Sequence, residues 1–255
     1  MLRYELLSLK VETPSFRTTV HPVVIHGGNE LILCDAGYPR QTDELEAALR
    51  LHGFSIKDLT GIIVTHHDHD HVGSLAALKA LNPRAEVIVG ALEADYVEGT
   101  SKSLRLIQAE ELNARLSGED RRRGEAFAEY LKSIVPCAVD RRIPDLDHLI
   151  MDDLRVVPTP GHTPGHISLF IESSKVLISG DALALESGRL TIPNPQFTLD
   201  LRASVESVAR LKRLGPETVV CYHGGSLKGD VGANLDALIA AYAPSLELTL
   251  ERPGR

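Results

Sequence analysis

Short runs of apolar residues, many of them β-branched, alternate along the chain with segments whose apolar residues recur at helical spacing. The apolar runs predict buried strands, and they lie at residues 30–35, 61–64, 86–89, 154–157, 167–171, 175–181 and 218–222. The helical spacing predicts amphipathic helices, which lie at residues 45–52, 201–214 and 234–242. Strands that alternate with helices in this way predict a sheet covered by helices.

The segment from about residue 92 to 147 has a different pattern. It is charged, contains few β-branched residues, and predicts two or three helices, including residues 104–116 and 125–134 with a break at 117–118. We expect one domain over residues 1–255, with the 92–147 segment as a helical insertion on its surface. We place no chemistry in that insertion.

Composition and charge narrow the class of protein. Of the 255 residues, 43% are hydrophobic, which is enough for one sizeable core. The formal net charge of -8 argues against a nucleic-acid partner, because binding to a polyanion needs clustered lysine and arginine. The basic run 121–123 has acidic neighbours, so it predicts a solvated helix face.

The N-terminus and the cysteines indicate the compartment. The first ten residues carry charges and lack the apolar core of a signal peptide, and no run approaches the roughly 18 apolar residues of a membrane span. We therefore expect a cytoplasmic protein with no membrane partner. Cys34, Cys137 and Cys221 are odd in number and widely spaced, so we expect packing rather than a disulfide framework.

A dense polar cluster follows the apolar run at 61–64. Residues 66–71 contain four histidines and two aspartates, and Ser74 then predicts the cap of a helix that stops at Asn82 and Pro83. Imidazoles and carboxylates crowded on one strand-to-helix turn repel one another, but they become good ligands once a divalent cation lies between them. The cluster therefore predicts a metal site.

This cluster resembles the central signature of the metallo-β-lactamase superfamily, whose usual form is T-H-x-H-x-D-H-x-G. His66, Asp70, His71 and Gly73 match it, and Asp68 stands where the family normally has its second histidine. The resemblance implies an α/β (α+β) fold, a four-layer αββα sandwich with its site at one edge between the two sheets. It also makes a lid or an oligomer contact an alternative to surface decoration for the insertion.

The rest of the chain contains the partners that the resemblance requires. A proline- and glycine-rich loop matches the family's third motif and supplies His162, a G-D pair supplies Asp181, and the closing H-G motif supplies His223. Asp35 stands where the family has an aspartate that orients a ligand by hydrogen bonding. The resemblance thus implies two divalent metal ions, one held by His66, Asp68 and His162 and the other by Asp70, His71 and His223, with Asp181 bridging.

The implied chemistry is hydrolysis. Two such cations activate a bridging hydroxide and polarise a carbonyl or phosphoryl oxygen, with Asp70 a proton acceptor as well as a ligand. Asp68 is a third aspartate in the core, which takes its formal charge from plus one to zero. Because a neutral core is a weaker Lewis acid and accepts harder cations, we expect zinc first, with iron or manganese as alternatives.

A second arrangement of the cluster stays open at this point. His67, His69 and His71 alternate, and they could present three imidazoles on one side of an extended segment. This arrangement leaves out Asp70 and breaks the match at His66, so we expect substitution of His67 or His69 to leave metal content nearly intact. For His166, which opens the strand after the third motif, we expect packing or hydrogen bonding rather than metal ligation.

The leading functional hypothesis is a hydrolase acting on an ester, lactone, thioester or related bond of a small molecule. The chain ends soon after His223, which disfavours hydroxyacylglutathione hydrolases, because these use a C-terminal helical domain to hold glutathione. No tyrosine follows Asp181 closely, which disfavours quorum-sensing lactonases. The lack of an export signal disfavours a true β-lactamase, and the acidic charge disfavours the nuclease branch.

Two other classes of function remain as alternatives. One is a non-haem iron oxidoreductase on the same fold, of the persulfide-dioxygenase or flavodiiron kind. The other is a metal-bearing protein that binds a ligand without catalysis. The substrate is a small molecule in the leading hypothesis, and a homo-oligomer stays open. Candidates for contacting the substrate by position alone are Phe16, Arg17, Arg189 and Phe197, together with residues that the 92–147 helices present.

Overall fold

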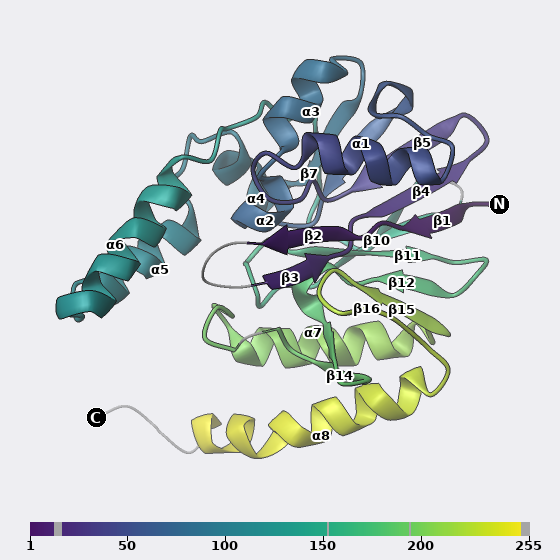
Figure 1. Cartoon of the computed structure of the whole chain (residues 1–255). Coiled ribbons are helices and arrows are strands. Elements are labelled where there is room, and N and C mark those ends of the chain that lie inside the picture. Colours follow the sequence, from purple (N-terminus) through teal and green to yellow (C-terminus); the bar gives the residue numbers. More distant parts are fainter. Residues whose placement is uncertain (13–16, 152, 194, 251–255) are drawn as a thin grey trace. The chain divides into compact units, whose positions relative to one another are not determined.

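The computed structural model describes residues 1–12, 17–151, 153–193 and 195–250, with only the backbone described from 245 onward. The chain divides into two compact units. The N-terminal unit contains residues 3–18 and 22–144, and the C-terminal unit contains residues 1–2, 19–21 and 145–255. Each unit has one six-stranded sheet, and each is described by itself below (Figure 1). The expectation of one domain over the whole chain stays a prediction.

The sheet of the N-terminal unit begins antiparallel and becomes parallel. Its strand order is β1-β4-β5-β6-β7-β8, with β1 at Arg3–Leu6, β4 at Val23–Gly27, β5 at Glu30–Cys34, β6 at Gly61–Val64, β7 at Glu86–Gly90 and β8 at Arg141–Ile143. Strands β5 to β8 run parallel. The carboxyl ends of β5 and β6 therefore meet at one edge, which brings Asp35 next to the polar cluster.

Helices connect these strands, and those within residues 42–51, 75–81 and 104–132 lie where the sequence predicts helices. They are α1 (Thr42–Leu51), the 3₁₀ helix η1 (Ile56–Asp58), α2 (His69–Val72), α3 (Leu75–Leu81), α4 (Ala91–Val97), α5 (Leu104–Asn113) and α6 (Gly118–Lys132). Ser74 precedes α3 as expected, but its hydroxyl makes no capping hydrogen bond. It donates instead to the carbonyl of Tyr38 at 2.6 Å, which ties the helix to the loop after β5.

The insertion is helical, but it is shorter than predicted. Residues 141–143 form β8, which pairs in parallel with β7, so the expectation of a helical segment as far as 147 is wrong at this point. The expected pair of helices is present as α5 and α6, packed through Leu106, Ala109, Ala128 and Leu131. In Figure 1 this teal pair lies side by side and extends away from the sheet of its own unit. The basic run 121–123 lies on α6, exposed and paired with Glu119 and Glu125 as predicted.

The sheet of the C-terminal unit is antiparallel except for one parallel pair, β12 with β15. Its order is β16-β15-β12-β11-β10-β9, with β9 at His148–Met151, β10 at Leu154–Pro158, β11 at Ile167–Ile171, β12 at Val176–Ile178, β15 at Thr218–Cys221 and β16 at Gly225–Lys228. A small hairpin of β13 (Ala184–Glu186) and β14 (Arg189–Thr191) occupies part of a segment that the sequence pattern does not predict as strand. Strands β2 (Leu9–Glu12) and β3 (Arg17–Val20) lie outside both large sheets, and the two halves of β3 fall in different units.

Two helices complete the core of the C-terminal unit. Helix α7 (Leu201–Arg213) begins after Asp200, whose carboxylate accepts the amide of Ala203 at 2.9 Å as a cap. Helix α8 (Val231–Leu250) is longer than the predicted 234–242. Both helices bury leucine and valine in one cluster with β12 and β15, and Figure 1 shows the two side by side. No helix in the described part of the chain meets the length and hydropathy needed to cross a bilayer.

Candidate metal centre

The polar cluster forms a tight turn at the carboxyl end of β6. His66, Asp68, Asp70 and His71 are all buried there, with at most 7% of each residue exposed. Gly73 permits this turn to pack closely, because a Cβ at this position would lie 2.3 Å from the backbone nitrogen of Pro39. The amide of Ala36 also donates to the carbonyl of His71 at 2.7 Å. The loop after β5 therefore fixes the position of the polar cluster through close packing and a backbone hydrogen bond.

Asp35 lies directly behind this turn. Its φ of 66° is unusual for a residue other than glycine, and such conformations are retained where the surroundings fix them. One carboxylate oxygen accepts the amide of Thr65 at 2.8 Å, and the other lies 2.9 Å from Nδ1 of His71. A carboxylate on Nδ1 favours the tautomer with its proton there, so Nε2 carries the lone pair that binds a metal. This is the contact that the predicted role of Asp35 needs.

Among the predicted ligands of the N-terminal unit, two histidine–aspartate pairs have the spacing of metal ligands. Nε2 of His66 lies 3.7 Å from Oδ2 of Asp68, and Nε2 of His71 lies 3.8 Å from Oδ2 of Asp70. These distances are too long for hydrogen bonds. Donors about 2.0 to 2.2 Å from a shared tetrahedral ion lie about 3.3 to 3.6 Å apart. The pairs are thus close to the separation that a common cation imposes on its ligands.

The C-terminal unit has a second donor set around Asp181. Its Oδ2 lies 3.5 Å from Nε2 of His162, and its Oδ1 lies 3.5 Å from Nε2 of His223. The carboxylate therefore presents one oxygen to each histidine, at the spacing of ligands on a shared ion. This geometry suits a carboxylate that bridges two cations.

Hydrogen bonds and close packing hold the residues of this second set. The amide of Asp181 donates to Nε2 of His166 at 2.9 Å, and Nδ1 of the same ring lies 2.8 Å from the hydroxyl of Thr159. The predicted hydrogen-bonding role of His166 is confirmed. Gly161 allows the loop that carries His162 to lie against α7, since a Cβ there would come within 2.3 Å of the amide of Ser204.

The donor chemistry of both sets fits a metal ion. Each of the seven predicted ligands belongs to at least one group of side chains able to hold one, and these residues are His66, Asp68, Asp70, His71, His162, Asp181 and His223. Imidazole and carboxylate donors suit zinc, iron and manganese alike, so the donor set does not by itself select among these metals.

The insertion supplies residues to the centre, which corrects the expectation that it has no chemistry. Arg105 on α5 is buried and donates to Asp68 through Nε and Nη2. Glu93 on α4, fully buried, accepts the amide of His67 at 3.0 Å and contacts its Nδ1. One signal could have revealed the contact between Arg105 and Asp68. The chain has one aspartate more than the family pattern, and an arginine lies on the buried face of a helix.

The alternative arrangement of alternating histidines is not present. Both ring nitrogens of His67 have partners in the N-terminal unit, since Glu93 lies at Nδ1 and the amide of Leu104 donates to Nε2 at 3.3 Å. The ring of His69 packs edge-on against Tyr38, Phe127 and Tyr130. Among the described residues, no group of side chains able to hold a metal ion includes either ring.

A family model described as the metallo-beta-lactamase superfamily matches residues 17–223. The chain belongs to this superfamily. A probable metallo-hydrolase of Bacillus subtilis strain 168, YflN, is 30% identical over 79% of this chain and 78% of its own length. A hydroxyacylglutathione hydrolase of Haemophilus ducreyi is 28% identical over 77% of this chain and 61% of its own length.

The fold is that of the superfamily as well. A metallo-beta-lactamase family protein from Thermus thermophilus aligns with a TM-score of 0.71 at 24% identity, covering 96% of this chain and 81% of the other. The predicted fold class, the α/β sandwich of this superfamily, is therefore confirmed.

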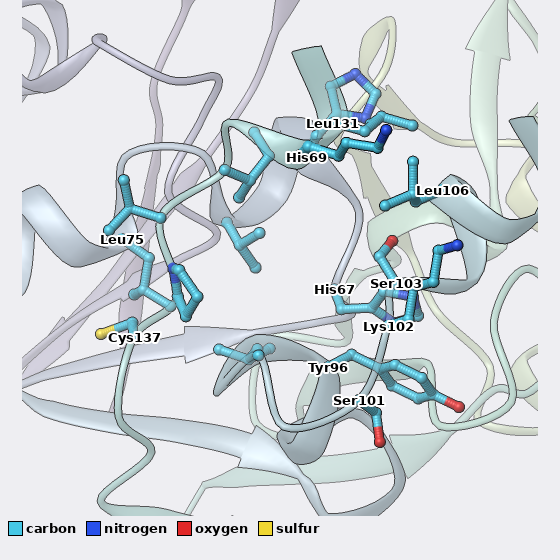
Figure 2. Close-up of a pocket in the computed structure, with 17 residues that line it drawn as sticks. His67, His69, Leu75, Tyr96, Ser101, Lys102, Ser103, Leu106, Leu131 and Cys137 are labelled. Carbon is cyan, nitrogen blue, oxygen red and sulfur yellow. The ribbon is translucent and has the colours of Figure 1, made fainter. Parts of the chain in front are cut away.

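In this superfamily member, a cavity of about 270 Å³ lies between the polar cluster and the insertion. Figure 2 shows Leu106, Lys102 and Ser103 of the insertion around it, with His67 and His69 of the cluster in its wall. Much of the remaining lining is apolar, including Val72, Leu75, Val97 and Leu131. The cavity is therefore suited to a short apolar group with polar contacts at one side.

The cysteines of the described chain are buried and unpaired. Burial raises the pKa of the Cys34 thiol well above its usual value, and the charge of Asp35 raises it further. Burial also raises the pKa of Cys137. These thiols stay protonated near neutral pH, so they are poor nucleophiles and the predicted packing role fits them.

Among the positions suggested for substrate contact, Arg17 is exposed and pairs with Glu12. Arg189 and Phe197 are exposed as well, and Phe16 lies outside the described residues.

Tyr130 of the insertion is a residue that the sequence pattern did not single out. Burial, helped by the negative charge of Asp70, raises the pKa of its phenol to about 12.

Proposed function

We propose that this protein is a metal-dependent hydrolase in which the two donor sets hold two divalent cations. His66, Asp68 and His162 would bind one, Asp70, His71 and His223 would bind the other, and Asp181 would bridge them. The observation that carries the proposal is the carboxylate of Asp181, with one oxygen toward His162 and the other toward His223. Its relatives support hydrolysis at the level of the family, since they include a probable metallo-hydrolase and a hydroxyacylglutathione hydrolase.

Different residues of the chain would have different roles in the reaction. Bound divalent cations supply Lewis acidity and a nucleophile at neutral pH. Asp35 holds the ring of His71, and His166 holds the backbone of Asp181. Asp70 is the carboxylate that would accept a proton during attack on the substrate, because it lies in the buried turn beside His71.

The proposed substrate is a small molecule with an ester, lactone, thioester or related bond. The cavity beside the cluster supports this class, because its volume and apolar lining suit a short acyl or alkyl group. We propose zinc as the first metal, with iron or manganese as alternatives that the imidazole and carboxylate donors also suit. A cytoplasmic location and the lack of a nucleic-acid or membrane partner stay predictions, and a homo-oligomer stays an open alternative.

A substrate panel tests the proposal. Protein purified without added metal is assayed against esters, lactones, thioesters and phosphodiesters, with metal analysis of the same sample and a chelator-treated control. We expect turnover of an acyl substrate that the chelator abolishes and zinc restores. Iron together with oxygen uptake would support the oxidoreductase alternative instead, and a metal-loaded protein without turnover would support the ligand-binding one.

A further inference from the structure

The aspartate that departs from the family pattern has a buried partner of opposite charge. Arg105 is 4% exposed and Asp68 is 5% exposed. Nη2 and Nε of Arg105 donate to the same oxygen, Oδ2 of Asp68, at 2.5 and 3.2 Å. Nη1 of the arginine donates to Gln108 at 2.5 Å, one turn further along α5. The guanidinium is thus fixed at both ends.

A buried arginine needs a reason to be there. Removing a guanidinium from water costs several kcal/mol, and this cost is offset only where a carboxylate lies in good geometry. A surface helix has no need of such a residue, since α6 keeps its arginines exposed. Arg105 instead reaches a residue 37 positions earlier in the chain. The pair therefore belongs to the cluster rather than to the stability of the helix alone.

We propose that Arg105 is a positioning residue that offsets the charge of Asp68, so that helix α5 of the insertion completes the metal centre. The proposal rests on the metal site proposed above. A neutral histidine at position 68 would need no counter-charge. Aspartate adds one negative charge to the centre, and the guanidinium adds one positive charge beside it. The formal charge of a centre with Asp68 and Arg105 therefore equals that of the usual pattern with histidine.

This account corrects the sequence-based expectation of a neutral core. That expectation counted the third aspartate but not the arginine, which lies in a segment to which no chemistry was assigned. With Arg105 included, the centre returns to a formal charge of plus one when two divalent cations and one hydroxide are counted. Charge alone then gives no reason for the centre to be a weak Lewis acid.

The pairing of Arg105 with Asp68 leads to a specific prediction about zinc affinity. Relative to the wild type, Arg105→Met leaves one negative charge more, Asp68→His leaves one positive charge more, and the double variant restores the balance. We expect zinc to bind most tightly to Arg105→Met and most weakly to Asp68→His. The wild type and the double variant should lie between them and close to each other. Each unit of charge should change affinity by about tenfold or more, because charges in a poorly screened interior act strongly on a divalent ion.

Ligand identity alone predicts the opposite for one of these variants. Imidazole is a good zinc ligand, and three histidines are a common zinc set. If only the ligand mattered, Asp68→His would bind zinc at least as tightly as the wild type whatever stands at position 105. The charge account predicts weaker binding, because the histidine would leave the buried guanidinium beside a dication.

The experiment measures zinc affinity by chelator competition on the metal-stripped full chain. The variants are Asp68→His, Arg105→Met, the double variant, and Arg105→Lys, which keeps the charge but has fewer donors. Arg121→Met is the matched control, because this arginine is exposed on α6 and pairs with a surface glutamate. The melting temperature of each metal-free variant is recorded in parallel, so that loss of folding is recognised.

The result we expect is rescue: Arg105→Met restores zinc affinity to the Asp68→His protein, Arg105→Lys stays within about threefold of the wild type, and the control is unchanged. Should Arg105→Met fail to fold, Arg105→Lys and the double variant still decide the matter. Failure of Arg105→Met to raise the zinc affinity of the wild type and of the Asp68→His protein, or a lower melting temperature with unchanged affinity, would overturn the proposal and leave the proposed hydrolase intact. A wild type that binds no zinc, iron or manganese would overturn both.

Discussion

The two units build their donor sets in different ways. In the N-terminal unit four predicted ligands lie within residues 66–71, on one turn, and side chains from other segments hold them. In the C-terminal unit His162, Asp181 and His223 come from three separate segments that follow strands, with Asp181 in the short 3₁₀ helix η2 (Gly180–Ala182). Backbone contacts and close packing do most of the holding. A contiguous set is visible in the sequence, whereas a dispersed set depends on the fold to bring it together.

Among substitutions that compare the two units, we expect the largest effect on metal content and activity at Asp181. Asp181→Asn keeps the shape of the side chain but removes the charge that would bridge two cations. We expect loss of at least one metal and a fall in kcat/KM of about a thousandfold or more. Metal analysis together with steady-state kinetics checks this, and a variant that keeps its full metal content and activity within threefold of the wild type contradicts the bridging role.

The residues that support each set allow a direct comparison. Asp35→Asn should weaken metal binding about 10- to 100-fold, because Asp35 contacts the ring of a ligand. His166→Phe removes the hydrogen bond to the backbone of Asp181 but keeps an aromatic ring beside His162, so we expect a smaller loss, about tenfold. Asp153→Asn, a surface carboxylate of the C-terminal unit bonded to Ser173, is the control. Equal losses in both variants would show that the two sets are supported alike.

The cavity beside the cluster gives a selective effect. Leu106→Trp should fill part of the space that Figure 2 shows and raise KM for substrates with longer acyl groups by about tenfold, with little change for the shortest ones. A series of esters of increasing acyl length measures it. An equal effect on every chain length would mean that the cavity does not receive the substrate.

Small effects on metal binding are expected at the two histidines of the cluster that are not predicted ligands. His67→Gln disturbs the contacts with Glu93 and Leu104 and should lower the melting temperature. It should leave metal content nearly unchanged, and so should His69→Gln, whose ring packs against aromatic residues. A loss of metal as large as in His66→Ala would reverse our assignment of the ligands.

At neutral pH we expect the smallest effect on stability from the thiols of Cys34 and Cys137. Burial raises the pKa of Cys34 and Cys137, so the folded state favours their protonated forms. Their contribution to stability is fully present below the unfolded pKa near 9 and is lost as pH rises through the higher folded pKa. We expect slow alkylation of the native protein at pH 8 and a melting temperature that falls above pH 9. Rapid alkylation of the native chain would contradict the burial.

The sequence predicts those strands and site residues whose structure is determined by residues nearby in the chain. The strand before the cluster, the aspartate at the end of β5 and the histidine after β15 follow from local patterns and from the family signature. The expected roles of Asp35 and His166 agree with contacts that the structure shows. Both residues lie next to strands, where local patterns are strong.

Contacts over a long separation and short edge strands escaped prediction. Arg105 and Glu93 meet the cluster across 37 and 26 residues, and no local pattern encodes such pairings. Strand β8 contains two arginines in three residues, so it lacks the apolar run of a buried strand. Its position at the edge of the sheet explains why the charges are tolerated.

The most direct test of the central claim is a metal titration of the chelator-stripped wild type, followed by hydrolase activity. If the donors of the two units form one dinuclear centre, activity appears with added zinc and saturates at two equivalents per chain. Activity that persists without metal, or that saturates at one equivalent and does not depend on the ligands of one unit, would contradict it.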